Sequence, residues 1–191
     1  MRRVEVVGPS CSGKTTTARR LAAVLGVPYV ELDALHHDAD WTEAPAEVLQ
    51  ERVRAALDAA PGGWVVDGTY FGKLGSLVLD RADTIVWLDI PFRTAVRRVL
   101  WRTVSRAITR EELWNGNRES LRLALSRDSI VLWVLRTHRG FAAKWGPRFE
   151  GRNVVRVTDS EEWLQSIQAS ESMSGSSNGS ERQKTPPLAD T

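Results

Sequence analysis

One short segment near the N-terminus constrains the fold of this chain more than any other feature. It reads Gly8-Pro9-Ser10-Cys11-Ser12-Gly13-Lys14-Thr15 and matches the pattern G-x-x-x-x-G-K-[ST] at every fixed position. Glycines let the backbone wrap around a phosphate group and point its N–H groups inward. Such a loop needs a strand before it and a helix after it. The segment therefore predicts a β–loop–α unit that binds phosphates.

The flanking residues have the required patterns. A β-branched run lies at residues 4–7, and apolar residues recur at helical spacing over residues 14–25. The start of that helix adds the positive end of its dipole to the loop. We expect Lys14 to reach the β- and γ-phosphates of ATP and Thr15 to ligate Mg²⁺. The expected ATP-binding residues of this segment are Gly8, Pro9, Ser10, Cys11, Ser12, Gly13, Lys14, Thr15 and Thr16.

Strand and helix patterns alternate after the loop. Apolar runs predict further strands at residues 28–32, 64–66, 83–89 and 153–157, with helical periodicity between them. Strands that alternate with helices form a parallel sheet with right-handed crossovers. The predicted fold is therefore α/β, with a five-stranded parallel sheet and helices on both faces.

Composition supports one globular domain without disulfides. The chain has 191 residues, of which 42% are hydrophobic and 26% charged, and its single cysteine excludes an internal bridge. Residues 1–168 form the predicted domain. Residues 169–191 are rich in Ser, Gly and Pro and predict a disordered tail.

Charge and hydropathy exclude several classes of partner. The net charge is only +2, from 26 basic and 24 acidic residues, which argues against a nucleic-acid binder. The longest stretch without a charged residue, 21–30, is half of a membrane span. The start of the chain has no apolar region typical of a signal peptide. We expect a cytoplasmic protein, and the sequence leaves open whether it is a monomer or a dimer.

Two carboxylates follow predicted strands. Asp33 follows the run at 28–32, and Asp67 follows the run at 64–66. In open α/β sheets, ligands bind beyond the carboxyl ends of the strands. Phosphoryl transfer uses one carboxylate near Mg²⁺ and another at the attacking hydroxyl. We predict that Asp67 serves the metal and Asp33 orients the acceptor; the alternative is that both cap helices.

Arginines recur at every fourth residue beyond position 91. Arg98, Arg102, Arg106 and Arg110 share one helix face, where like charges destabilise a bare helix. An anionic ligand would relieve that repulsion. We predict an Arg-rich helical lid over about residues 102–122, with Arg98 and Arg102 binding ATP; the alternative is a solvated helix face. The expected catalytic residues are Lys14, Asp33, Arg102 and Arg106.

Further segments carry a family resemblance. The chain has a W-x-x-D-G-x-Y segment at 64–70 and an A-D-x-I-x-x-L-D-x-P segment at 82–91. With the loop, these resemble the P-loop kinases of the adenylate kinase-related group, most of all the bacterial topology modulation proteins, or adenylate-kinase-like P-loop ATPases. The resemblance covers about residues 1–168. It implies a P-loop NTPase fold, Mg²⁺, and ATP as phosphoryl donor.

The resemblance also implies residue roles and one departure. Arg98 and Arg102 match two ATP-side arginines, Asp67 a metal-shell aspartate, and Asp33 the acceptor-site aspartate of shikimate- and gluconate-kinase-like relatives. The D-G-T-Y-F segment at 67–71 lacks the arginine with which adenylate kinases bind a monophosphate, so AMP is not the expected acceptor. The expected acceptor pocket contains Asp33, His36, Trp41, Asp67 and Tyr70.

These observations predict an ATP-dependent phosphotransferase. It would move the γ-phosphoryl group of ATP to a hydroxyl or phosphate of a small molecule that the sequence does not name. The alternative is a regulatory module, in which bound ATP orders the lid and changes affinity for a partner, because a fold and a nucleotide site do not establish chemistry.

Overall fold

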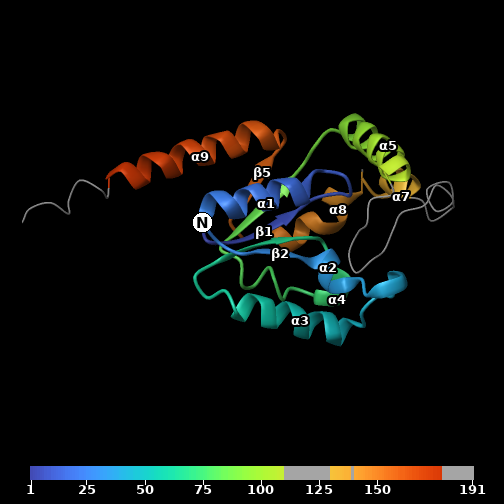
Figure 1. Ribbon diagram of the computed structural model, residues 1–191, viewed down its shortest axis with the longest axis horizontal. Coiled ribbons are helices and arrows are strands. Elements are labelled where there is room, and N and C mark those ends of the chain that lie inside the picture. Colours follow the sequence, from blue (N-terminus) through green and yellow to red (C-terminus); the bar gives the residue numbers. More distant parts are fainter. Residues whose placement is uncertain (110–129, 139, 178–191) are drawn as a thin grey trace, which may run out of the picture.

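The computed structural model describes residues 1–109, 130–138 and 140–177 (Figure 1). All strand pairs are parallel and form one five-stranded sheet in the order β2-β3-β1-β4-β5. The predicted α/β sheet is confirmed. Its strands are β1 (Arg3–Val7), β2 (Tyr29–Glu31), β3 (Trp64–Asp67), β4 (Thr84–Leu88) and β5 (Val154–Val157).

Helices cover both faces of the sheet (Figure 1). Helices α1 and α9 lie on one face, while α3, α4 and α8 lie on the other. Helix α5 packs against α7 beside the phosphate loop. The described helices are α1 (Lys14–Leu25), α2 (Leu32–His36), α3 (Ala46–Asp58), α4 (Phe71–Leu74), α5 (Phe92–Thr109), α7 (Ile130–Thr137), α8 (Phe141–Trp145) and α9 (Ser160–Ser177), with short 3₁₀ turns at η1 (Ala39–Trp41) and η3 (Gly146–Phe149).

Alternation along the strands divides the core into two layers. Val4 and Val6 of β1 pack with Leu21 of α1 and Leu164 of α9. On the other face, Trp64 packs with the apolar side of α3. A slip of one residue would move every side chain to the wrong face, so this burial fixes the register of the sheet. The register in turn fixes which strand ends meet at the functional edge.

The last helix is longer than predicted. It runs past residue 168, the predicted end of the domain, to Ser177. The disordered tail predicted for residues 169–191 stays a prediction. The packed first turns of α9 nucleate the helix, and each added residue then costs little. Ser170 also donates its hydroxyl to the Ser166 carbonyl, at 2.9 Å. Residues 178–191 lie outside the described ranges.

The predicted lid is described only in part. Its first residues belong to α5, which ends at Thr109. Residues 110–122 lie outside the described part of the chain. Within the described ranges, no helix is long and apolar enough to cross a membrane.

Glu5 is an acidic residue inside the sheet. Its side chain is 1% exposed, and its Oε2 has no hydrogen-bond partner among the described residues. Its Cα lies opposite Val66 and Ile85 of the two neighbouring strands. Burial raises the pKa of Glu5 to about 8, although the positive charge of Arg152 opposes the shift. The folded protein therefore holds Glu5 protonated at neutral pH.

This burial predicts a pH-dependent loss of stability. Between the ordinary pKa of 4.5 and the folded pKa of about 8, only the unfolded chain releases the Glu5 proton, so the free energy of unfolding falls as pH rises. Glu5→Gln removes this dependence. We expect the melting temperature of the wild type, measured relative to that of the variant, to fall by at least ~3 °C from pH 5 to pH 8. Scanning calorimetry at both pH values tests this, and a constant difference contradicts it.

Candidate active site

Two glycines hold the phosphate loop against the sheet and α5. Gly8 follows β1 with φ +155°, and a Cβ there would lie 2.8 Å from the Leu88 carbonyl oxygen of β4. Gly13 precedes α1 with φ +95°, and a Cβ there would lie 3.1 Å from Nη1 of Arg98. Both positions therefore exclude a side chain, which explains the two fixed glycines of the motif.

Two cations lie against this loop. Lys14 Nζ donates to the carbonyl oxygens of Gly8, at 3.1 Å, and Pro9, at 3.0 Å. Arg98 of α5 donates from Nη1 to the Ser12 carbonyl oxygen at 2.8 Å. The structure thus brings together a lysine and an arginine that sequence analysis expected at the phosphates. A loop that carries these charges at a helix N-terminus is suited to an anion.

The tip of the loop is fixed by packing. Cys11 has φ +62° and lies half-buried against the cluster of Ile90, Ala95 and Val99. The Ser12 hydroxyl is buried and has no partner among the described residues. Pro9 and Ser10 complete the turn between Gly8 and Ser12, and the Ser12 N–H donates to the Pro9 carbonyl at 3.2 Å.

Thr15 and Asp67 meet at the carboxyl edge of the sheet. The Thr15 hydroxyl donates to Asp67 Oδ2 at 2.5 Å. Asp67 ends β3 and is buried, and its Oδ1 has no hydrogen-bond partner in the described ranges. Burial raises the pKa of Asp67, while the Lys14 charge and the Thr15 hydrogen bond oppose the rise. A hydroxyl and a carboxylate with a spare oxygen fit Mg²⁺, which takes oxygen ligands and few of them from protein.

Sequence analysis missed a third residue at this carboxylate. The Tyr29 hydroxyl of β2 donates to Asp67 Oδ2 at 3.3 Å. The Arg19 guanidinium lies 5.3 Å from the centre of the Tyr29 ring and pairs with Glu31 at 2.9 Å. No motif contains Tyr29. Only the pairing of β2 with β3, which sets Glu31 opposite Asp67, brings its hydroxyl to the site.

Asp33 lies near the predicted place but on a different element. Strand β2 ends at Glu31, and Asp33 belongs to the first turn of α2 rather than to a strand end. The Tyr70 hydroxyl donates to Asp33 Oδ1 at 2.6 Å. Burial, followed by the Asp33 charge, raises the pKa of Tyr70, so that hydroxyl stays a donor. The negative charge of Asp33 also contributes to the raised pKa of Asp67.

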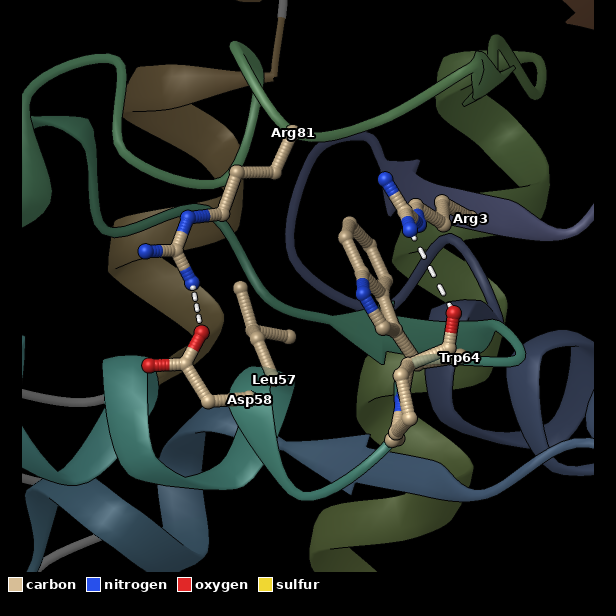
Figure 2. Close-up of a pocket in the computed structure, with 7 residues that line it drawn as sticks. Arg3, Leu57, Asp58, Trp64 and Arg81 are labelled. Atoms are coloured by element: carbon tan, nitrogen blue, oxygen red, sulfur yellow. Dashed lines mark hydrogen bonds and ion pairs between the residues drawn. The ribbon is translucent and has the colours of Figure 1, made fainter.

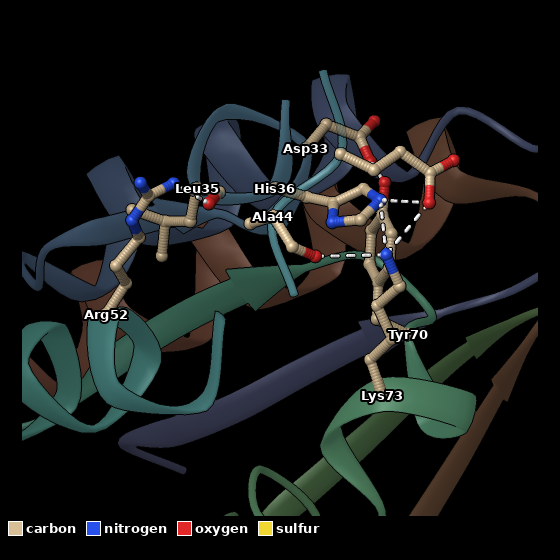
Figure 3. Close-up of polar contacts among 8 residues, drawn as sticks. Asp33, Leu35, His36, Ala44, Arg52, Tyr70 and Lys73 are labelled. Atoms are coloured by element: carbon tan, nitrogen blue, oxygen red, sulfur yellow. Dashed lines mark hydrogen bonds and ion pairs between the residues drawn. The ribbon is translucent and has the colours of Figure 1, made fainter. Parts of the chain in front are cut away.

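Aromatic rings gather beside Asp33. The ring centroids of His36 and Tyr70 are 4.6 Å apart, those of His36 and His37 4.6 Å, and those of His37 and Trp41 5.5 Å. Burial, then the charges of Lys73 and His37, lower the pKa of His36. Figure 3 shows Asp33, His36 and Tyr70 side by side. The structure therefore brings His36 and Tyr70 to Asp33 and Trp41 to His37, and their role as an acceptor pocket stays a prediction.

Three predicted site residues remain untested by the described contacts. Arg102 lies on α5, and its buried Nε has no hydrogen-bond partner among the described residues. The side chain of Arg106 lies outside the described part. Thr16 is exposed on α1. Their roles at ATP stay predictions.

A hollow of about 280 Å³ lies away from these residues (Figure 2). Arg3 and Trp64 on its wall begin β1 and β3, so it lies at the opposite end of the strands from the phosphate loop. Within it, Arg81 pairs with Asp58 at 2.7 Å and Arg3 donates to the Pro61 carbonyl at 3.3 Å. None of the residues that sequence analysis expected in the site lines this hollow.

Comparison with known proteins identifies the fold. No protein-family model and no curated protein matches the sequence. A shikimate kinase from Acinetobacter baumannii in complex with shikimate matches with TM-score 0.54 and 16% identity over 96% of each chain. A shikimate kinase from Bacteroides thetaiotaomicron matches with TM-score 0.51 and 13% identity over 93% of this chain and 98% of the other. A gluconokinase from Sinorhizobium meliloti 1021 matches with TM-score 0.50 and 18% identity over 95% and 98%.

These matches define a class by its architecture. The chain has the fold of the P-loop small-molecule kinases, over nearly its whole length. At identities of 13% to 18%, the likeness shows the fold alone. The finer resemblance to topology modulation proteins stays a prediction.

The loop geometry predicts the effect of removing its lysine. Lys14→Ala is expected to weaken the binding of Mg-ATP by about 100-fold or more, because charge-assisted hydrogen bonds to two phosphates are lost. The fold should survive, since the hydrogen bonds that Lys14 makes in the described part of the chain go to loop carbonyls and not to the core. Titration calorimetry measures the affinity. Lys144→Ala on α8 is the matched control, and equal affinity in the Lys14 and Lys144 variants would contradict the assignment.

Proposed function

We propose that this protein is an ATP-dependent phosphotransferase that moves the γ-phosphoryl group of ATP to a small molecule. The observation that carries the proposal is the contact between Thr15 of the phosphate loop and the buried Asp67, at 2.5 Å. A hydroxyl from the loop and a carboxylate from the neighbouring strand serve Mg²⁺ in phosphoryl transfer. Asp33 stands close by as a second carboxylate, held by Tyr70.

The phosphate loop and its cations bind and orient ATP. Loop N–H groups, Lys14 and Arg98 would surround the phosphates, and Thr15 and Asp67 would hold Mg²⁺. When bound, Mg²⁺ neutralises charge on the phosphate oxygens. Arg102 and Arg106 are proposed to add positive charge on the side of α5. Because phosphoryl transfer needs little covalent help, positioning and charge neutralisation account for most of the rate.

Asp33 is proposed to receive the proton of the acceptor hydroxyl. Tyr70 occupies Oδ1 of Asp33, which leaves Oδ2 for the acceptor. The hydroxyl oxygen forms a bond to the γ-phosphorus as the bond from that phosphorus to the β–γ bridging oxygen breaks. The electron pair of the broken bond leaves with ADP, and the hydroxyl proton passes to Asp33.

The structural neighbours support the class of reaction. Two are shikimate kinases and one is a gluconokinase, so this fold carries enzymes named for phosphorylating small hydroxylated molecules. The regulatory alternative predicts ATP binding without turnover that depends on an acceptor. Kinetic measurements on two aspartate variants distinguish this regulatory alternative from the proposed phosphotransferase.

Replacement of the two aspartates by asparagine should affect different steps, turnover in one variant and Mg²⁺-dependent binding of ATP in the other. Asp33→Asn is expected to keep ATP affinity within a few-fold and to lower acceptor-dependent turnover by about 100-fold or more, because a positioned proton acceptor is lost. Asp67→Asn is expected to raise the Mg²⁺ concentration needed for ATP binding by ~10-fold or more. Calorimetry and steady-state release of ADP measure these effects.

Asp58→Asn supplies the matched control, because Asp58 pairs with Arg81 at the opposite end of the strands. If both residues only capped helices, Asn would replace Asp with little loss. Unchanged turnover in both Asn variants would overturn the assignment and favour the regulatory module.

A further inference from the structure

Lys73 of α4, which lies beside His36, is already hydrogen-bonded to groups of the protein. Lys73 Nζ donates to Glu43 Oε2 at 2.8 Å and to the Ala44 carbonyl at 3.0 Å, and it lies 3.5 Å from His36 Nε2 (Figure 3). The hydrogen bonds to Glu43 and Ala44 use two of the three N–H donors of the ammonium, and the contact to His36 uses the third in the tautomer whose Nε2 accepts. The hydrogen bond from Lys73 also lowers the pKa of Glu43, which keeps the paired carboxylate ionised.

The neighbouring arginines are committed in the same way. Arg52 donates from Nη1 to the Leu35 carbonyl at 2.8 Å and to Asp38 Oδ1 at 3.0 Å, and from Nη2 to Asp38 Oδ2 at 3.3 Å. This two-pronged pairing is the geometry with which arginine binds carboxylates. Arg19, near β2, pairs with Glu31. Each of these cations is therefore neutralised by a carboxylate of the chain.

Among the described residues, a row of aromatic rings runs from Tyr70, which is hydrogen-bonded to Asp33, through His36 and His37 to Trp41. Trp41 and the preceding Asp40 have φ of +55° and +56°, a region that residues with a side chain rarely adopt. Such strain is concentrated at segments that contact ligands. This backbone holds the half-buried Trp41 ring against the ring of His37. The His37 ring in turn contacts His36, which packs on Tyr70. Aromatic faces of this kind bind planar or puckered rings by stacking.

We infer that the acceptor is an uncharged ring that carries hydroxyl groups, an inference that rests on the proposed function. In this inference, Asp33 accepts a hydrogen bond from an acceptor hydroxyl, and the rings of Trp41 and His37 stack on the apolar face of the acceptor ring. A carboxylate on the acceptor would instead meet Asp33, Glu43 and Asp38. The cations described around these acids are already paired, and an anion without a counter-charge is costly to desolvate.

Nucleosides and neutral sugars both contain an uncharged ring with hydroxyl groups. Binding measurements with one probe from each class distinguish between them. Uridine and glucose are titrated calorimetrically into the full chain with Mg²⁺ and a non-hydrolysable ATP analogue. Orotidine and glucuronate are their counterparts with one added carboxylate. We expect at least one neutral probe to bind ~10-fold or more tightly than its acidic counterpart, and the probe that binds identifies nucleoside or sugar. Acidic probes that bind equally well, or neutral probes that both fail to bind, overturn the inference.

Two variants test the residues that carry the argument. Trp41→Ala should weaken binding of the neutral ring by ~10-fold, the scale of one stacking contact. Glu43→Gln removes the counter-charge of Lys73 and should strengthen binding of the acidic probe by several-fold. Glu47→Gln on the exposed side of α3 removes an equal charge without touching Lys73, and it should change neither affinity. Affinity for the ATP analogue, measured in the same titrations, shows that each variant is folded.

The outcomes keep this inference separate from the proposed function. A neutral ring that binds but yields no ADP with ATP supports the inference and contradicts phosphoryl transfer. An acidic ring that binds and is phosphorylated supports phosphoryl transfer and contradicts the inference. Equal effects of Glu43→Gln and Glu47→Gln would likewise show that pairing of Lys73 does not select the acceptor.

Discussion

The hydrogen bond between Thr15 and Asp67 is the contact on which the candidate site depends. Thr15 lies in the first turn of α1 and Asp67 ends β3, so the bond forms only because β1 and β3 are parallel neighbours. The path of the loop from β1 to α1 also requires Gly8, where any side chain would strike β4. The bond also reduces the cost of burying Asp67, whose pKa is raised by burial and lowered again by Lys14 and Thr15. A loop, two strands and a helix are thus held in place around one carboxylate.

The sheet order separates the metal side of this site from the acceptor side. In the order β2-β3-β1-β4-β5, the phosphate loop follows the central strand. Asp67 lies one strand away, and Asp33, after β2, lies on the outer side of Asp67. Ligands bind where the strand order reverses, beyond the carboxyl ends of the strands. The two acids can therefore take different roles at one edge, because the topology sets them at different distances from the phosphates.

Local patterns predicted the loop and the fold, because both depend on residues close in sequence. The eight-residue motif and the alternation of strands and helices are read within short windows, and Asp67 follows from the end of an apolar run. Asp33 was misplaced by one element, since β2 ends at Glu31 and α2 begins at once. Tyr29 and the Lys73–Glu43 pair could not be found, because each depends on contacts between segments far apart in the chain. The extension of α9 to Ser177 was not predicted, because this polar segment has no apolar face that a pattern could reveal. It is helical because it continues a helix whose first turns are packed on the sheet.

Electrostatic interactions link Asp67, on the proposed metal side of the site, to Asp33, on the proposed acceptor side. Asp33 and Glu31 each contribute to the raised pKa of Asp67, so negative charge accumulates at this edge of the sheet. If the proposed Mg²⁺ is bound, it would compete with a proton for Asp67 and would offset part of this negative charge. An uncharged acceptor of the kind we infer needs no counter-charge at this edge, whereas an anionic acceptor would still meet the carboxylate of Asp33. The internal pairs of Lys73 and Arg52 act in the same direction, because they leave no excess positive charge among these residues that would favour an acid. The proposed nucleotide site and the inferred neutral acceptor therefore make compatible electrostatic demands on Asp67 and Asp33.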